Sequence, residues 1–124
     1  MSPTFSTLSC VAFLPVIGLL SQAGSWLVVP YAGSLVAMLA YHLSSEQRWR
    51  RLDHVFAWSV IVANAWLAVG TRSVGWTSAG LALVAGSLAF YRQAHRGPYH
   101  AWHGLWHLSS GAACFCFARG YLAA

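Results

Sequence analysis

Five long apolar runs occupy most of this chain of 124 residues, and short polar segments separate them. The runs cover residues 5–20, 26–43, 52–69, 74–90 and 99–117. Each approaches the roughly 20 residues that an α-helix needs to cross a bilayer. Because a backbone in lipid must satisfy its own hydrogen bonds, runs of this kind fold as helices. The sequence therefore predicts an all-α, polytopic transmembrane helix bundle of about five spans, formed as a single domain over residues 1–124.

The composition excludes an ordinary water-soluble domain. Hydrophobic residues make up 58% of the chain and charged residues only 7%, whereas soluble domains carry roughly 25% charged residues. So few charges could not cover the surface of a water-soluble protein of this size. We therefore expect the lipid bilayer to surround the bundle.

Arginine accounts for the whole positive charge, because the chain has no lysine. Arg48, Arg50 and Arg51 lie between the second and third runs, and Arg92 and Arg96 lie between the fourth and fifth. Positive residues favour the cytoplasmic side of a membrane. This bias predicts an integral, multi-pass membrane protein with a cytoplasmic N-terminus and an external C-terminus. The arginines form no continuous basic stripe, so nucleic acid is not an expected partner.

Four ionisable residues lie near one edge of the predicted bundle. His42 ends the second run, Asp53 opens the third, and His103 and His107 lie near the start of the fifth. The predicted topology brings all four to the cytoplasmic side. His103 and His107 are one helical turn apart and share a face. Ionisable residues within a membrane are costly and usually functional, so we expect one shared site.

Three imidazoles with one open position form a known type of catalytic zinc site. Zinc held by His42, His103 and His107 would generate a hydroxide nucleophile from bound water. The Asp53 carboxylate could accept the proton of that water or orient a ligating histidine. This depth is where the acyl linkage of a membrane lipid lies. The residues therefore predict a zinc-dependent enzyme that hydrolyses amide or ester bonds of a membrane lipid substrate.

The spacing of these residues resembles that of the alkaline ceramidases and their wider superfamily. That superfamily includes the progestin- and adiponectin-receptor-like proteins and the GPI-remodelling phospholipases. Its pattern is a histidine near one helix end, an aspartate opening the next helix, and H-x-x-x-H in the last helix. Here 53 − 42 gives an offset of 11, as in the ceramidases, and residues 102–107 read Trp-His-Gly-Leu-Trp-His. The resemblance implies His42, His103 and His107 as zinc ligands, with Asp53 either orienting the metal-bound water or acting as base.

The chain departs from the family pattern in two respects. The family has seven helices, whereas five are predicted here. The family also has a serine four residues before the first histidine, where this chain has Met38. Ser34 lies two turns before His42 on roughly the same face and could replace that serine through a water molecule. Ser34 is therefore a candidate catalytic residue.

Two other functions are open alternatives. His42 and His107 on facing helices could be the axial ligands of a b-type haem in a membrane redox protein, although Asp53 would then have no role. The chain could also be a non-catalytic membrane receptor or assembly subunit, which the loss of the family serine favours. A second copy of the chain could supply the missing helices, so a homo-oligomer is a further option.

Structural roles compete with functional ones at several positions. Asp53 could serve as the N-cap of the third helix. Asn64, in the middle of the third run, is expected to form an interhelical hydrogen bond, and Pro15 predicts a kink in the first run. The three cysteines all lie in apolar runs and are interpreted as packing residues: Cys10, Cys114 and Cys116.

Overall fold

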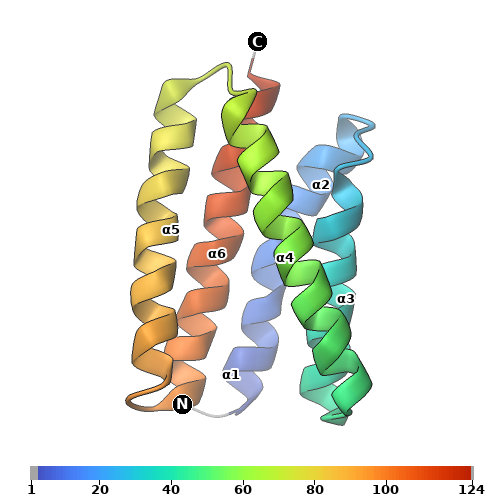
Figure 1. Ribbon diagram of the computed structural model, residues 1–124, viewed down its shortest axis with the longest axis vertical. Coiled ribbons are helices and arrows are strands. Elements are labelled where there is room, and N and C mark those ends of the chain that lie inside the picture. The colour runs from blue at the N-terminus through green and yellow to red at the C-terminus, as the bar shows by residue number, and fades with distance from the viewer. Residues whose placement is uncertain (1–2, 124) are drawn as a thin grey trace.

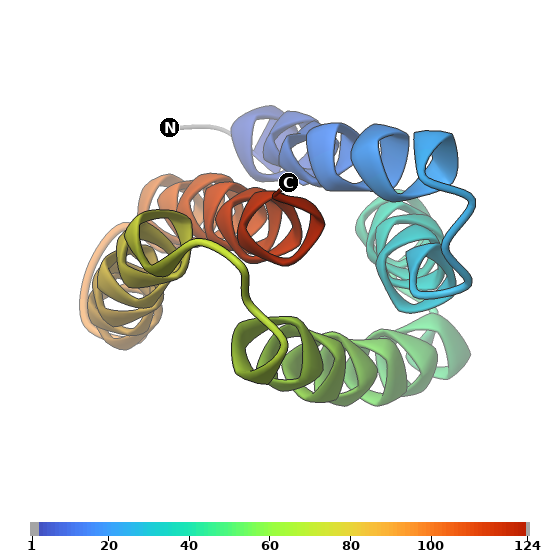
Figure 2. The same ribbon diagram turned by 90° about the horizontal axis from the view of Figure 1, so that it is seen from above.

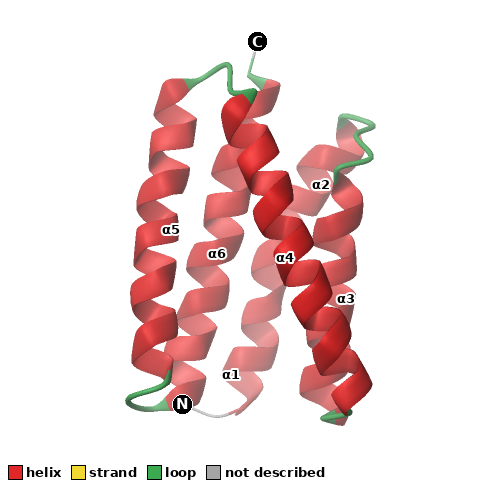
Figure 3. Cartoon of the chain, viewed as in Figure 1, coloured by secondary structure: helices red, strands yellow, loops and turns green. Residues whose placement is uncertain are grey.

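The computed structural model describes residues 3–123, which are all-helical and contain no strand (Figure 3). The elements are α1 (Pro3–Leu8), the 3₁₀ helix η1 (Ser9–Phe13), α2 (Leu14–Gln22), α3 (Val28–Ser44), α4 (Gln47–Val69), α5 (Val74–Ala94) and α6 (Tyr99–Leu122). The first three follow one another along a single path (Figure 1), and we call them together the first rod. The predicted all-α class is confirmed.

Pro15 explains why the first rod is not a regular helix. Its nitrogen cannot donate a hydrogen bond to the carbonyl of Val11, and its ring crowds that carbonyl. The Leu14 N–H bonds to Val11 O instead, three residues back, and the preceding turn adopts the tighter 3₁₀ form. Where the sequence predicts a kink, the chain thus forms a tightened turn, and this turn carries Ser9 and Cys10.

Helix α6 lies at the centre of the bundle. It packs against α5 and also contacts α1, η1, α2 and α4. Seen from above, the first rod and α5 flank α6, and α3 lies between the first rod and α4 (Figure 2). Two glycines allow the first rod to approach α6 closely. A Cβ at Gly111 would collide with the backbone of Ala12, and one at Gly104 would collide with the Phe5 ring.

A polar chain links three helices in the middle of the bundle. The hydroxyl of Tyr31 in α3 donates to Oδ1 of Asn64 in α4, at 2.6 Å. The Asn64 amide in turn donates to Sγ of Cys114 in α6, at 3.4 Å. The interhelical hydrogen bond predicted for Asn64 is confirmed, and the buried thiol of Cys114 belongs to the packed interior.

Three helical segments of the described chain are long and apolar enough to cross a membrane: Phe5–Gln22, Gln47–Val69 and Val74–Ala94. The apolar helix α3 is shorter, with 17 residues, and α6 is long enough but less apolar because it contains histidines, serines and glycines. Large apolar side chains on the outer faces of α4 and α5 are exposed, among them Val55, Trp58, Val62, Trp66, Leu81 and Leu88. These features support the predicted membrane environment.

The start of α4 differs from the sequence prediction. The helix begins at Gln47, not near residue 52, so Arg48, Arg50 and Arg51 belong to its first two turns and not to a loop. Glutamine and arginine are good helix formers, so the helix extends beyond its apolar run. The N-cap position is Glu46. Asp53 lies in the second turn, and its interpretation as an N-cap is wrong.

Candidate metal centre

Side chains that can bind a metal come together from three separate elements at one end of the bundle. Cys10 comes from η1, His42 from the last turn of α3, and His107 from the first half of α6. One potential ligand atom of each lies within 4.8 Å of the other two. This end, where α1 and α6 begin and α3 ends, is the lower end in Figure 1. We call the three residues the ligand group.

His103 lies directly beside the ligand group. Its ring centroid is 4.3 Å from that of His107 and 5.5 Å from that of His42, and the rings of His42 and His107 are 5.6 Å apart. The structure therefore brings the three predicted histidines together. However, the ligand group as found contains Cys10 as its third member, where the sequence predicts His103.

Aromatic neighbours hold the ring of His103. It stacks on Tyr99, with centroids 4.8 Å apart and an interplanar angle of 23°. The ring of Trp106 meets it edge-on, at 5.0 Å. Since both neighbours lie on α6, these contacts fix the orientation of His103 within its own helix.

Hydrogen bonds from the first rod set the protonation of His107. The hydroxyl of Ser9 donates to the carbonyl of Ser6 at 2.7 Å, and the same hydroxyl lies 2.9 Å from Nδ1 of His107. Nδ1 of His107 also lies 3.2 Å from Ser6 O, which can only accept a hydrogen bond, so the tautomer with the proton on Nδ1 fits both contacts. Its Nε2 is then the unprotonated nitrogen, which is the form that binds metal.

Cys10 is fully buried and its thiol faces His107. The Sγ atom lies 3.7 Å from Nδ1 of His107 and donates to Ser6 O at 3.5 Å. Interpreted from the sequence as a packing residue, Cys10 is therefore also a member of the ligand group. The signal that could have revealed this is the spacing of Ser6, Ser9 and Cys10, which places three polar groups on one face of an apolar helix.

Asp53 borders this region from the second turn of α4. The side chain is half-buried, and its carboxylate lies within electrostatic range of the Cys10 thiol and the Tyr99 hydroxyl. Within residues 3–123 it has no hydrogen-bond or ion-pair partner. It also interacts electrostatically with His54, the next residue of α4.

Ser34 lies farther along α3. It is buried, and it precedes His42 by eight residues, which corresponds to about 12 Å along the helix axis. Met38, on the intervening turn, is packed in the core. A catalytic role for Ser34 therefore needs a substrate that extends from the ligand group along α3, and it stays a prediction.

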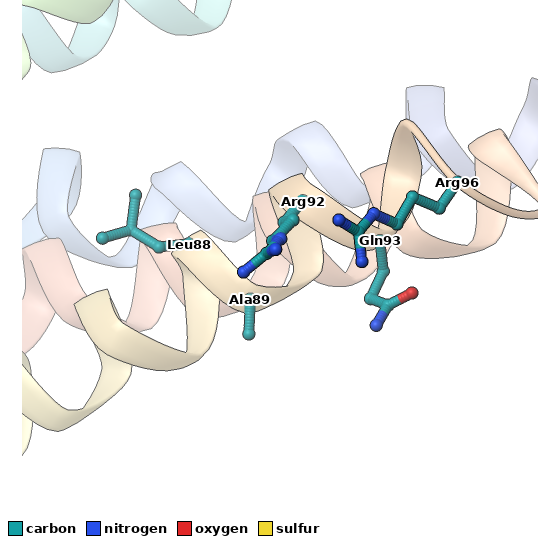
Figure 4. Close-up of a pocket in the computed structure, with 5 residues that line it drawn as sticks. All are labelled: Leu88, Ala89, Arg92, Gln93 and Arg96. Carbon is teal, nitrogen blue, oxygen red and sulfur yellow. The ribbon is translucent and has the colours of Figure 1, made fainter.

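Two surface hollows lie elsewhere. One lies at the end of α5 and in the turn that follows it, and it is lined by five residues (Figure 4): Leu88, Ala89, Arg92, Gln93 and Arg96. The other is an apolar groove where the first rod meets α6, and it includes Ala12, Pro15, Leu108 and Phe115. Neither hollow contains a member of the ligand group, which is packed within the bundle.

Comparisons of the chain with protein-family models, curated proteins and solved structures find no match. The resemblance to the alkaline ceramidases therefore rests on the spacing of His42, Asp53, His103 and His107. Function is inferred from the geometry of these residues and of Cys10.

Proposed function

We propose that this protein is a zinc-dependent membrane hydrolase that cleaves the acyl amide or ester bond of a membrane lipid. The observation that carries the proposal is the convergence of His42 and His107 with a third ligand atom at one end of the bundle. Asp53, which interacts electrostatically with Cys10, supplies the carboxylate that such chemistry needs. Three protein ligands and one open position are typical of catalytic zinc.

The chemistry of the donors suits zinc. Imidazole nitrogen and thiol sulfur are ligands of zinc, whereas magnesium and calcium prefer oxygen. The bond between His107 and Ser9 adds the outer support that ligating histidines commonly have. Since His42 and His107 belong to different helices, the bundle itself sets the separation of the two imidazoles.

A bound zinc ion would supply an activated water and polarise the carbonyl of the scissile bond. Asp53 then has two tasks. It accepts a proton from the water as that oxygen attacks the acyl carbon, and it returns the proton to the leaving amine or alkoxide as the carbon–nitrogen or carbon–oxygen bond breaks. Cys10 and His107, both buried, limit the access of other water to the reacting carbonyl.

The proposal places five helical rods across the membrane. Three of them contain the long apolar segments, namely the first rod, α4 and α5, and the other two are α3 and α6. The N-terminus is cytoplasmic and the C-terminus external. His42 is two residues from the end of α3, and His107 is eight residues into α6, about 12 Å along its axis. This depth corresponds to the acyl linkages below the headgroups. Arg48 and Arg92, near the same bundle end, fit the cytoplasmic side.

The packing of the ligand group disfavours the haem alternative. A porphyrin between His42 and His107 would have to occupy the space where Cys10 and His103 lie against these rings. Measurement of lipid hydrolysis distinguishes a hydrolase from a non-catalytic receptor or assembly subunit.

The test is metal content and lipid hydrolysis by protein purified in detergent. The wild type is compared with Asp53→Asn and His107→Ala, with N-acyl and O-acyl lipids offered in mixed micelles. We expect Asp53→Asn to retain zinc but to lose about 10²- to 10⁴-fold of the rate, because it keeps the shape without the basic carboxylate. His107→Ala should lose both metal and activity.

The hydrolase assignment is wrong if zinc-loaded wild type cleaves no lipid in a broad acyl-lipid panel and Met38→Ser, which restores the family serine, gains no activity. An absorption spectrum of bound haem iron in the purified protein would instead favour the redox alternative.

A further inference from the structure

We propose that the thiolate of Cys10 is a metal ligand and that His103 is not, so that the metal is held by Cys10, His42 and His107. This inference rests on the metal site of the proposed function but is independent of hydrolysis. It also departs from the three-histidine set that the family resemblance implies.

The distances within the ligand group suit a single ion. In tetrahedral zinc sites, bonds of about 2.3 Å to sulfur and about 2.0–2.1 Å to nitrogen place the ligand atoms roughly 3.3–3.6 Å apart. The atoms of Cys10, His42 and His107 lie within 4.8 Å of one another. Adjustments of about 1 Å, which side-chain rotations can supply, would bring them to bonding distance.

The backbone of the first rod presents Cys10 to this position. The 3₁₀ turn upstream of Pro15 carries the residue, and the close contact of Ala12 with Gly111 holds that turn against α6. The thiol is fully buried, with Sγ 3.7 Å from Nδ1 of His107 and 3.5 Å from Ser6 O. Both contacts are weak for a buried sulfur, and neither uses Nε2 of His107, which stays available to the metal.

The other cysteines of the chain have different surroundings. The thiol of Cys114 accepts a hydrogen bond from Asn64 in the middle of the bundle. Cys116 lines the apolar groove between the first rod and α6. Neither belongs to the ligand group, so a thiolate signal from a bound metal would identify Cys10.

His103 is held by contacts that compete with metal binding. Its stacking on Tyr99 and its edge contact with Trp106 would both be disturbed if the ring turned to become a ligand. In its present orientation it lies next to His107 without joining the ligand group.

A thiolate ligand has a chemical consequence. Only the deprotonated sulfur binds metal, so each ion bound through Cys10 displaces one proton, which leaves to the solvent. The sulfur also biases the site toward zinc and cobalt and away from cations that prefer oxygen.

The experiment is a titration of the full-length, metal-free protein in detergent with cobalt(II), which replaces zinc and is visible spectroscopically. We expect tetrahedral cobalt bands together with a near-ultraviolet charge-transfer band from thiolate to cobalt. Cys10→Ser should lose the charge-transfer band. Loss of a residue that only supports a ligand weakens metal binding roughly 10- to 100-fold, and loss of the ligand Cys10 should weaken zinc binding by at least as much. His103→Phe, which preserves stacking on Tyr99, should keep the band.

Cys116→Ser is the matched control, because it removes a buried thiol outside the ligand group, and it should leave the spectrum unchanged. Cobalt bound to the wild type without a thiolate band would overturn the inference even if Cys10→Ser failed to fold. So would a His103→Phe protein that no longer binds metal. A thiolate-bound metal in a protein without lipid hydrolysis would refute the proposed function alone.

Discussion

The hydroxyl of Ser9 lies 2.9 Å from Nδ1 of His107, although 98 positions separate the two residues in the chain. This hydrogen bond joins the first rod to α6 beside the ligand group, and it leaves Nε2 of His107 unprotonated. The orientation of a ligand in the last helix is thus set by a side chain in the first.

Loss of this hydroxyl should weaken metal binding without removing a ligand. In Ser9→Ala, Nδ1 of His107 loses its shortest contact and keeps the longer one to Ser6 O, at 3.2 Å, so we expect zinc affinity to fall about 10-fold. Competition with a chromophoric chelator would measure the change. Ser59→Ala is the control, because the Ser59 hydroxyl bonds only within its own helix, to Val55 O at 3.0 Å. Unchanged affinity in Ser9→Ala would refute the role given to this bond.

Gly111 and Gly86 allow a glycine-to-alanine substitution to be compared at a packed position and at an open one. Gly111→Ala places a methyl group against the backbone of Ala12, whereas a Cβ at Gly86 meets no atom within 4 Å. We expect Gly111→Ala to lower the melting temperature and the zinc affinity, because the first rod must move away from α6. Gly86→Ala should be neutral or stabilising by up to about 1 kcal/mol. Thermal unfolding in detergent checks both, and equal behaviour would contradict the packing argument.

The hydrogen bond between Tyr31 and Asn64 should contribute to stability but not to metal binding. Tyr31→Phe removes the donor, and interhelical hydrogen bonds of this kind contribute roughly 0.6 kcal/mol on average and about 1.7 kcal/mol at most. We expect a decrease of this size in the free energy of unfolding, measured in mixed micelles. Zinc affinity should stay at the wild-type value, and a loss of metal would show that the middle of the bundle is coupled to its end.

The five-crossing topology can be tested by labelling single cysteines placed in the turns. With the native cysteines replaced, Ser45→Cys should react only with a reagent that reaches the cytoplasm, and Ser73→Cys only with one added outside. A reporter fused after α6 should be external. A cytoplasmic reporter would mean that one of the five rods does not cross, and α3, the shortest single helix of the five, would be the first to re-examine.

The helical class follows from the apolar runs, but the helix ends do not. The residues before the third run are polar, yet Gln47 and Arg48 favour helix and extend α4 toward the interface. Hydropathy predicts where an apolar run ends, whereas the end of a helix also depends on helix propensity and capping. Hydropathy alone therefore predicts a helix start near Asp53, whereas α4 begins six residues earlier, at Gln47.

The site is predictable only in part for a similar reason. The proximity of His42 and His107 could be predicted from the order of the helices, because the sequence places both near the same end of the bundle. The contact of Cys10 with His107 depends on which helix neighbours α6 and on the turn imposed by Pro15. A sequence reveals the polar face of a helix, but the partner of that face is decided by packing. Asn64 illustrates the same limit, because its bonding could be predicted while its partner, Tyr31, could not.

The closure of the ligand group by the first and last helices has a consequence for biosynthesis. Cys10 precedes His107 by 97 residues, so at ordinary rates of translation its thiol is made roughly 5 to 20 s before that imidazole exists. During this interval the proposed metal site lacks one of its three ligands. Uptake of the ion would therefore follow synthesis of α6, and a chain that ends before this helix would lack His107.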